Sequence, residues 1–252
     1  MWGLLNQPEK EPPWPSKIQG FSFSPLRADH NPQLGKFPTE EQIASDLQLL
    51  SDTAFAVRTY TVDGVFGKIP AIAHQNGLNV ALGAWIDKDE TRNESELQRL
   101  KKVYLENISN IVRVIVGNEA ILRKDRTPQQ MITYIDRLQG EIEAPISTAE
   151  PWHVWLDNPE LAKHVDYLAV HFLPYWEEQP VDNAVLFIAE QYELLRKTFP
   201  GKPIVITEVG WPSRGRTRGA AEASAANQAR FLRRFLHLAE RERYTYYVLE
   251  AF

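Results

Sequence analysis

The sequence predicts a (β/α)₈ barrel, in which eight parallel strands alternate with helices around a closed sheet. Three observations lead to this prediction. From residue 20 onward, eight short β-rich runs alternate with helical stretches. Polar or aromatic residues recur at the carboxyl end of nearly every run. No glycine-rich phosphate-binding turn follows the first run, which disfavours the alternative, a doubly wound open sheet.

The strand-forming runs are short and rich in β-branched and aromatic residues. In chain order they read GFSFSP, AFAVRTY, NVALGAW, IVRVIVGNE, PISTAEPW, VDYLAVHFLPYW, PIVITEVGW and TYYVLEAF, at residues 20–25, 54–60, 79–85, 111–119, 145–152, 165–176, 203–211 and 245–252. Because strand and helix alternate throughout, the strands are expected to be parallel and joined by right-handed crossovers.

Helical stretches separate these runs. In the first one, Thr39 can cap the helix, acidic residues fill its first turn, and Ile43 and Leu47 begin an apolar stripe. The others are predicted near residues 67–75, 94–105, 128–138, 159–163, 183–198 and 221–240. No helix follows the last run, so we expect the eighth outer helix to be missing or truncated, or residues 1–19 to cover that flank.

The composition excludes several function classes. The net charge of −5 and the pI near 5.7 provide no basic surface for nucleic acid. The absence of Cys excludes disulfides and thiolate chemistry. The histidines lack metal-ligand spacing, so we expect neither a metal nor a cofactor. No apolar run reaches the roughly 20 residues that span a bilayer.

The predicted strand ends gather the residues of a candidate site, because the active sites of such barrels lie at the carboxyl face. The side chains at these ends include Arg58, Tyr60, Asn118, Glu119, Glu150, His171, Tyr175, Trp176, Glu208, Trp211 and Glu250. Paired carboxylates that approach a bond from two sides are typical of glycoside cleavage. Arg58 could hold Glu208 ionised by pairing with it, and half-apolar surroundings are expected to raise the pKa of Glu119.

Two motifs, VGNEAILR at residues 116–123 and ITEVGWPS at residues 206–213, make this chemistry more specific. They resemble the two signatures of glycoside hydrolase family 17, which comprises β-1,3-glucanases and glucanosyltransferases on (β/α)₈ barrels. VRTY, LPYW, NQARFLR and LEAF also resemble family segments, so the similarity runs from Gly20 to Phe252. The resemblance implies a retaining enzyme with β-1,3-linked gluco-oligosaccharides as donor and acceptor.

The resemblance also implies roles for individual residues. Glu119 becomes the general acid/base and Glu208 the nucleophile. The implied substrate-binding residues are Arg58, Tyr60, Asn118, Glu150, His171, Tyr175, Trp176, Trp211 and Glu250. Plant members have a Tyr where this chain has Leu173, so we expect Tyr175 to be the hydrogen-bond partner of the nucleophile. Glu150 has a second interpretation, an ion pair with Arg58.

The beginning of the chain resembles bacterial members in which this domain follows a membrane helix and precedes a membrane glycosyltransferase. Residues 1–19 are then a linker or juxtamembrane remnant, and residues 20–252 form the catalytic domain. Trp2 to Leu5 would be the trailing edge of the membrane helix. The resemblance implies a periplasmic domain at the bacterial inner membrane, monomeric in isolation and fused to a glycosyltransferase.

The sequence leaves the exact activity open. We expect a glucanosyltransferase, which passes the glucosyl group to another sugar. A hydrolytic β-1,3-glucanase is the first alternative, and a non-catalytic glucan-binding barrel the second. The presence of both Glu119 and Glu208 disfavours the non-catalytic barrel.

Overall fold

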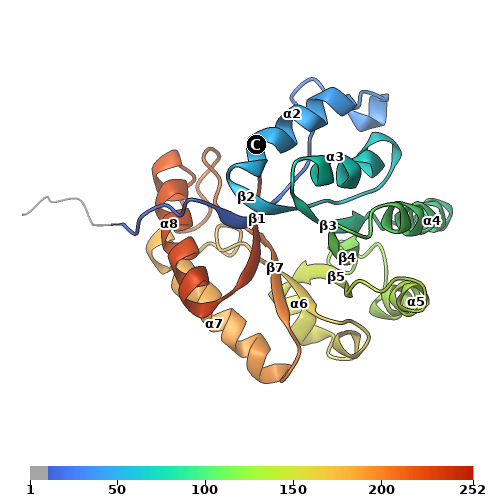
Figure 1. The fold of residues 1–252 in the computed structure, drawn as a ribbon. Coiled ribbons are helices and arrows are strands. Elements are labelled where there is room, and N and C mark those ends of the chain that lie inside the picture. Colours follow the sequence, from blue (N-terminus) through green and yellow to red (C-terminus); the bar gives the residue numbers. More distant parts are fainter. Residues whose placement is uncertain (1–10, 252) are drawn as a thin grey trace, which may run out of the picture.

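The computed structural model describes residues 11–251, and they form a closed barrel of eight parallel strands in chain order (Figure 1). The barrel closes where Phe21 of the first strand pairs with Val248 of the last. The strands are β1 (Ile18–Ser22), β2 (Ala54–Arg58), β3 (Asn79–Ala84), β4 (Ile111–Asn118), β5 (Ile146–Pro151), β6 (Leu168–Phe172), β7 (Ile204–Val209) and β8 (Thr245–Val248). The predicted (β/α)₈ barrel is therefore confirmed.

Helices surround the barrel and connect successive strands (Figure 1). The α-helices are α2 (Glu40–Ser51), α3 (Ile69–Gln75), α4 (Glu90–Glu106), α5 (Pro128–Gln139), α6 (Trp152–Asp157), α7 (Val181–Thr198) and α8 (Ala225–Glu242). Short 3₁₀ turns are η1 (Pro32–Leu34), η2 (Gly64–Lys68) and η3 (Leu161–Lys163). Within residues 11–251 no helix follows β8, in agreement with the prediction.

Helix starts follow the capping pattern in the sequence. The Thr39 hydroxyl accepts the Gln42 N–H, while the Gln42 side chain accepts the Thr39 N–H, which satisfies two backbone donors at the start of α2. Thr127 and Gln130 form the same reciprocal pair at the start of α5. These caps fix where each helix begins, and therefore how long the preceding loop at the rim can be.

The core has two parts, one between strands and helices and one inside the barrel. The second is a small cluster in which four Ala residues pack with Tyr167, Tyr247, Ile115 and Val205. A Cβ on Gly20 would stand 2.6 Å from the Tyr247 ring, which is too close for two carbon atoms, so only glycine fits at that position. Arg113 donates to the Tyr247 hydroxyl at 3.2 Å. Side chains thus fill the barrel interior, as in other barrels of this size.

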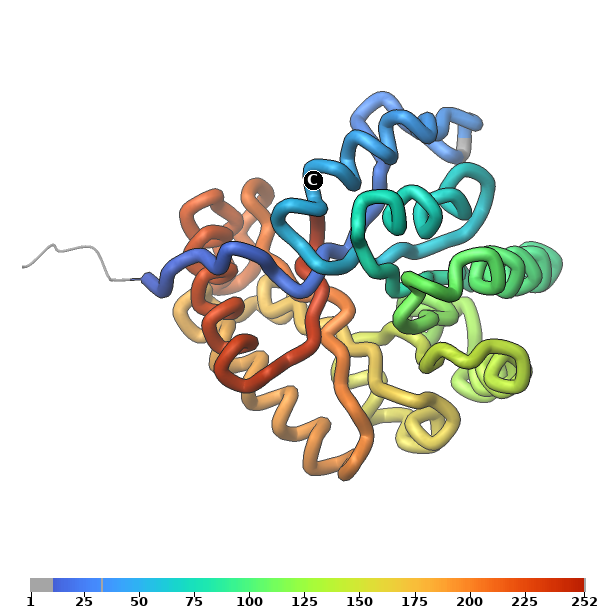
Figure 2. The backbone as a smooth tube through the Cα atoms, viewed as in Figure 1, coloured from blue at the N-terminus to red at the C-terminus, as the bar shows by residue number. Residues whose placement is uncertain are grey.

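One detail differs from the sequence prediction. β1 begins at Ile18, two residues before the predicted domain boundary, because residues from Ile18 to Ser22 pair with β2. The segment before β1 runs along α8 (Figure 2). There Glu11 pairs with Arg234 at 2.7 Å, and the Pro12 carbonyl accepts a hydrogen bond from Arg233. The predicted membrane-helix remnant from Trp2 to Leu5 lies outside the described residues.

Candidate active site

Glu208, at the carboxyl end of β7, is held by two donors from β2 and the loop after it. Arg58 Nη1 lies 2.7 Å from Glu208 Oε1, and the Tyr60 hydroxyl donates to the same oxygen at 2.9 Å. Arg58 is fully buried and Glu208 is only 6% exposed. Burial raises the pKa of Tyr60 far above its ordinary value, although the Arg58 charge lowers it, so the hydroxyl keeps its proton. Glu208 is a fixed carboxylate with a guanidinium against it.

The sequence interpretation assigned the wrong hydrogen-bond partner to Glu208. Tyr175 was expected to be the hydrogen-bond partner of the nucleophile, and this is wrong. Its hydroxyl donates instead to the Arg216 carbonyl in the loop after β7. Tyr60 takes the expected position on Glu208. Leu173 and Tyr175 follow β6 in a turn, and the path of that turn directs the Tyr175 ring under the loop after β7.

Glu119 follows β4 with a backbone shape that is uncommon for its residue type. Gly117 has φ +84° and Glu119 has φ +54°, and the pairing of β4 with β5 shifts register between Ile115 and Asn118. A Cβ on Gly117 would stand 2.8 Å from the end of the Met131 side chain. The strand therefore bends at Gly117, and the bend presents Glu119 at the rim with 24% of its side chain exposed.

His171, from β6, lies between the two carboxylates. Its Nδ1 is 2.9 Å from Glu119 Oε1 and 3.6 Å from Glu208 Oε2. One oxygen of each carboxylate and a ring nitrogen of His171 all lie within 4.8 Å of one another. That spacing could also hold a metal ion, but Arg58 already neutralises Glu208 and disfavours a second cation there. The absence of a metal therefore stays a prediction.

The pKa of Glu119 differs from the sequence expectation. Burial raises it, but the hydrogen bond and charge of His171, together with the charges of Arg123 and Arg58, lower it more strongly. The net pKa lies below the ordinary value of a carboxyl, so the predicted increase is wrong. The sequence shows the apolar strand before Glu119, but not that Arg123 from the following turn and His171 and Arg58 from other strands gather around its carboxylate.

Glu150, at the end of β5, makes different contacts from those expected. It is fully buried, and its two oxygens accept the N–H groups of Ile121 at 2.8 Å and Leu122 at 3.2 Å. Arg58 pairs with Glu208 and Asn118, so the alternative of a Glu150–Arg58 ion pair is wrong. Glu150 supports the turn that follows Glu119.

The aromatic residues after β6 and β7 form an edge-to-face cluster in which one ring is exposed. Trp211 and Tyr175 are buried, with ring centroids 5.7 Å apart, and the Trp211 indole donates to the Glu222 carbonyl. Trp176 packs on the edge of Tyr175 and is 59% exposed, with the Arg218 guanidinium 4.6 Å from its ring. Of these three rings, Trp176 is the one that can offer a face to a ligand.

A pocket of about 1040 Å³ opens beside the carboxylates, along the ends of β1, β2 and β3. Its lining includes Tyr60, Asn118 and Glu250. The Asn118 oxygen accepts from Arg58, which leaves its NH₂ group as a donor toward the pocket. Glu250 is exposed as a residue, but its carboxyl group is partly buried. This burial and the charge of Glu208 both raise the pKa of Glu250.

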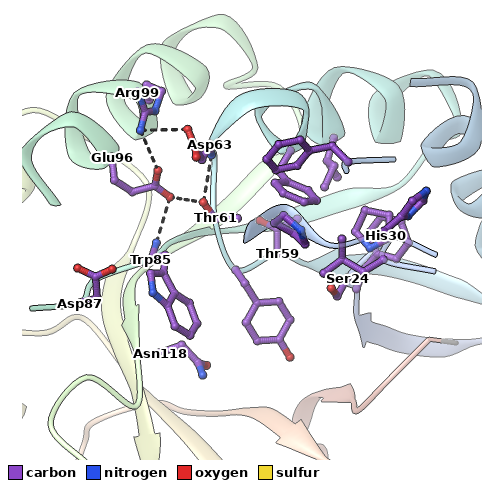
Figure 3. Close-up of a pocket in the computed structure, with 18 of the residues that line it drawn as sticks. Ser24, His30, Thr59, Thr61, Asp63, Trp85, Asp87, Glu96, Arg99 and Asn118 are labelled. Carbon is purple, nitrogen blue, oxygen red and sulfur yellow. Dashed lines mark hydrogen bonds and ion pairs between the residues drawn. The ribbon is translucent and has the colours of Figure 1, made fainter. Parts of the chain in front are cut away.

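The sequence interpretation missed a buried carboxylate in the wall of this pocket, Glu96 of α4 (Figure 3). It accepts the Thr61 hydroxyl at 2.6 Å and the N–H groups of Val62 and Trp85 at 2.9 and 3.1 Å. Glu96 thereby joins the loops after β2 and β3. Glu96 lies four residues before Leu100 and seven before Val103, on the apolar face of α4, and a carboxylate on that face is the signal that could have identified it.

Residues 20–252 match the family described as the BtgE/BtgC glycoside hydrolase domain. The chain belongs to this family. Two of its relatives and one solved structure bear family 17 names, in agreement with the sequence resemblance. The probable family 17 glucosidase SCW4 of Saccharomyces cerevisiae is 27% identical over 220 residues, which are 84% of this chain and 55% of that protein. The chain thus spans about half the length of the curated relatives it matches first.

Solved structures show the same similarity. The glycoside hydrolase family 17 β-1,3-glucanosyltransferase from Rhizomucor miehei superposes with a TM-score of 0.83 at 26% identity, covering 92% of this chain and 86% of that chain. An active-site mutant of the Rhizomucor miehei β-1,3-glucanosyltransferase, in complex with laminaritriose, gives a TM-score of 0.83 at 25% identity, with the same coverage.

The relatives correct the expected location. They are fungal proteins, and one of them is the cell surface mannoprotein MP65 of Candida albicans, 26% identical over 83% of this chain and 56% of that protein. The predicted place at the periplasmic face of a bacterial inner membrane is therefore wrong. In the part of the chain that the structure describes, none of the helices combines the length and apolarity needed to cross a bilayer.

Proposed function

We propose that this family 17 domain cleaves β-1,3-glucan with retention of configuration, through a covalent glycosyl-enzyme intermediate. The observation that carries the proposal is the close spacing of Glu119 and Glu208, which bring carboxylate oxygens within 4.8 Å. Retaining enzymes hold their two carboxyl groups about 5–5.5 Å apart, whereas inverting enzymes separate them by about 6.5–9.5 Å to admit a water. The observed spacing favours direct attack by one carboxylate.

In the first step, Glu208 attacks the anomeric carbon of the donor, and Glu119 gives a proton to the departing glycosidic oxygen. Arg58 and Tyr60 fix the attacking carboxylate through two hydrogen bonds to Oε1, which leaves Oε2 as the nucleophilic atom. Glu119 enters this step as the minority protonated form, because its pKa is lowered by His171 and the arginines despite burial. We therefore expect the activity to have its pH optimum on the acid side of neutrality.

In the second step, Glu119 accepts a proton from the incoming hydroxyl, which attacks the anomeric carbon and releases Glu208. The lowered pKa of Glu119 suits this step. Burial raises this pKa, but His171 and the arginines lower it more, so the carboxylate is the stable form and can accept the proton. His171 Nδ1 remains within hydrogen-bond distance of Glu119 Oε1 and orients it. One residue thus acts as acid and then as base.

The positions of the carboxylates separate a donor side from an acceptor side. The proton donor lies next to the leaving group, so the leaving and incoming sugars lie on the side of Glu119, near the loops after β5, β6 and β7. The pocket along β1, β2 and β3 lies on the other side and fits the retained part of the donor. The Asn118 NH₂ group and Trp85 can contact sugar hydroxyls and rings there (Figure 3). Glu250, which also lines the pocket, can contact sugar hydroxyls.

We further propose that another sugar, rather than water, is the preferred acceptor. Trp176 supports this because its exposed ring, on the acceptor side and backed by Tyr175, is a suitable surface for a pyranose. The similarity to the Rhizomucor miehei glucanosyltransferase, and to its mutant structure with laminaritriose, supports both the transfer and the substrate class. Hydrolysis by water is the alternative outcome of the same intermediate.

The test is incubation of the purified domain with single laminari-oligosaccharides, followed by mass and linkage analysis of early products. Products longer than the donor support transfer, and products that are all shorter would contradict it. The Glu119→Gln and Glu208→Gln variants should yield neither. Monomeric behaviour, a separate linker at residues 1–19 and fusion to a membrane glycosyltransferase are predictions from the sequence that stay untested.

A further inference from the structure

The turn that carries Glu119 is held in an unusual shape. Glu119 has φ +54° and Lys124 has φ +58°, both in the left-handed region that residues with a Cβ rarely adopt. Backbone bonds close the turn from Arg123 N–H to the Glu119 carbonyl at 2.8 Å and from Asp125 N–H to the Ala120 carbonyl at 2.9 Å. Such a shape persists only where the surroundings fix it.

The fixing contacts come from β5. Glu119 N–H donates to the Ala149 carbonyl at 2.7 Å, and the N–H groups of Ile121 and Leu122 both donate to the Glu150 carboxylate. β5 therefore holds the turn at three points. Two of the three depend on a single side chain, that of Glu150.

Glu150 is poorly placed to bind substrate. It is fully buried, it is absent from the lining of the pocket, and each of its oxygens already accepts a backbone N–H. A buried carboxylate is costly unless it is well hydrogen-bonded. The contacts of Glu150 are directed at the backbone next to Glu119, which is where its effect on the chemistry must arise.

We propose that Glu150 is a positioning residue, whose carboxylate clamps the turn after β4 and so aims Glu119 at the glycosidic oxygen. The inference rests on the proposed function, in which Glu119 is the acid/base. Each of the two N–H groups requires an acceptor, and each carboxyl oxygen of Glu150 supplies one.

The titratable groups that face Glu150 are Glu119 from the end of β4 and His171 from β6. Burial raises the pKa of Glu150 to about 7, against the two N–H bonds and the His171 charge, while the Glu119 charge raises it further. Glu150 therefore keeps its proton in the acidic range where Glu119 titrates, because the pKa of Glu119 is lowered. Its effect on Glu119 arises from the hydrogen bonds to the backbone.

Two variants separate the effect of the length of the Glu150 side chain from the effect of its carboxyl group. Glu150→Gln keeps the length, but its NH₂ group faces one N–H donor and the carboxyl group is lost. Glu150→Asp keeps the carboxyl group but is one methylene too short to reach both Ile121 and Leu122. Asp166→Asn is the matched control, because Asp166 accepts the Ile146 N–H at 2.7 Å at the opposite end of β5.

Each variant is assayed with two donors, a laminari-oligosaccharide and a dinitrophenyl β-laminarioside whose leaving group needs no proton. For Glu150→Gln we expect kcat/KM on the oligosaccharide to fall by about tenfold to 100-fold, within the range of acid catalysis, with less than about a threefold fall on the aryl donor. The basic limb of its pH profile should match that of the wild type, because Glu150 is already uncharged at the pH where Glu119 titrates. Glu150→Asp should show the same donor dependence with the wild-type pH limb, and Asp166→Asn should match the wild type.

Thermal unfolding of each variant shows whether it is folded at the assay temperature. Equal losses on both donors, or unchanged activity on both, would overturn the positioning role. If the wild type and Glu119→Gln turn over the oligosaccharide equally, the proposed function itself fails and the inference falls with it. These outcomes are distinct, because the second depends on Glu119→Gln and the first on Glu150.

Discussion

His171 and Glu119 form the contact that joins the two candidate catalytic carboxylates. His171 Nδ1 lies 2.9 Å from Glu119 Oε1 and 3.6 Å from Glu208 Oε2, while the ring is 1% exposed. A group in this position can lower the pKa of Glu119 by a hydrogen bond and by charge, against the opposing effect of burial. His171 therefore sets the balance between the acid and base forms of Glu119.

Replacing His171 tests this balance. His171→Phe removes the hydrogen bond and the charge, so burial is less opposed and the pKa of Glu119 should rise. Glu119 would then keep its proton to higher pH, and the basic limb of kcat/KM against pH should move upward. His171→Gln can still donate a hydrogen bond, so it should fall between Phe and the wild type. A basic limb that moves downward in His171→Phe would contradict the account.

Arg58 is predicted to be important for both stability and activity. Arg58→Met leaves Glu208 buried without its ion-pair partner, which should cost about 3–5 kcal/mol in the free energy of unfolding. Loss of a hydrogen bond to the attacking carboxylate should lower kcat/KM by about tenfold to 100-fold. Urea unfolding and steady-state kinetics give the two values.

The matched control for Arg58 is a second ion pair of equal length. Arg27 and Asp46 are also 2.7 Å apart, but the Arg27 side chain is 44% exposed. Arg27→Met should therefore cost less than about 1 kcal/mol and leave the activity unchanged. Similar losses of stability in both variants would show that burial does not determine the strength of the Arg58–Glu208 pair.

The pKa of Glu150 predicts a pH dependence of stability. Burial raises this pKa to about 7 in the folded protein, from an ordinary value of 4.5, despite the N–H bonds that lower it. Between these two values the folded state holds the proton more tightly than the unfolded state, so this group's stabilisation is complete below pH 4.5 and is lost as the pH rises through 7. The loss should be about 3 kcal/mol, since one pKa unit is about 1.4 kcal/mol.

Comparison with Glu150→Gln isolates this contribution, because Gln does not titrate. The difference in unfolding free energy between wild type and variant, measured in urea at several pH values from 5 to 8, should shift against the wild type as the pH rises. A difference that stays constant over this range would show that Glu150 is already ionised in the folded protein at pH 5.

Trp176 is predicted to affect the choice of acceptor and not the attack on the donor. Trp176→Ala removes the exposed ring on the acceptor side, so the ratio of transfer products to hydrolysis products should fall. The rate of release from an aryl donor should change little. Trp14→Ala is the matched control, because Trp14 is also exposed at 49% and lies near an arginine, Arg233, away from the rim. An unchanged product ratio in Trp176→Ala would contradict the acceptor role.

The sequence could predict the barrel because eight strands and their helices follow local patterns of period and capping, such as the reciprocal pair of Thr39 and Gln42. It could also place Glu119 and Glu208 at the rim, since each directly follows or ends a strand. The contacts of Tyr175, Glu150 and Trp211 depend on the paths of loops, which have no such periodicity. Tyr60 therefore occupies the position expected for Tyr175, and Glu150 binds backbone instead of Arg58.

The pKa of Glu119 shows the same limit for electrostatics. The apolar run before Glu119 indicates burial, which does raise its pKa, but His171, Arg123 and Arg58 together lower it further than burial raises it. Arg123 lies in the turn after Glu119, whereas His171 and Arg58 come from other strands. Their combined effect depends on distances of a few ångströms, and only the folded structure supplies those distances.

The most direct test of the central claim is to trap the covalent intermediate. A 2-deoxy-2-fluoro β-glucosyl donor with an activated leaving group slows release of the sugar from a retaining enzyme. Mass analysis of the intact protein and its peptides should show one added fluoroglucosyl unit on Glu208, formed in the wild type and absent from Glu208→Gln. A protein that turns over the donor with no adduct, or with the adduct on another residue, would contradict the account.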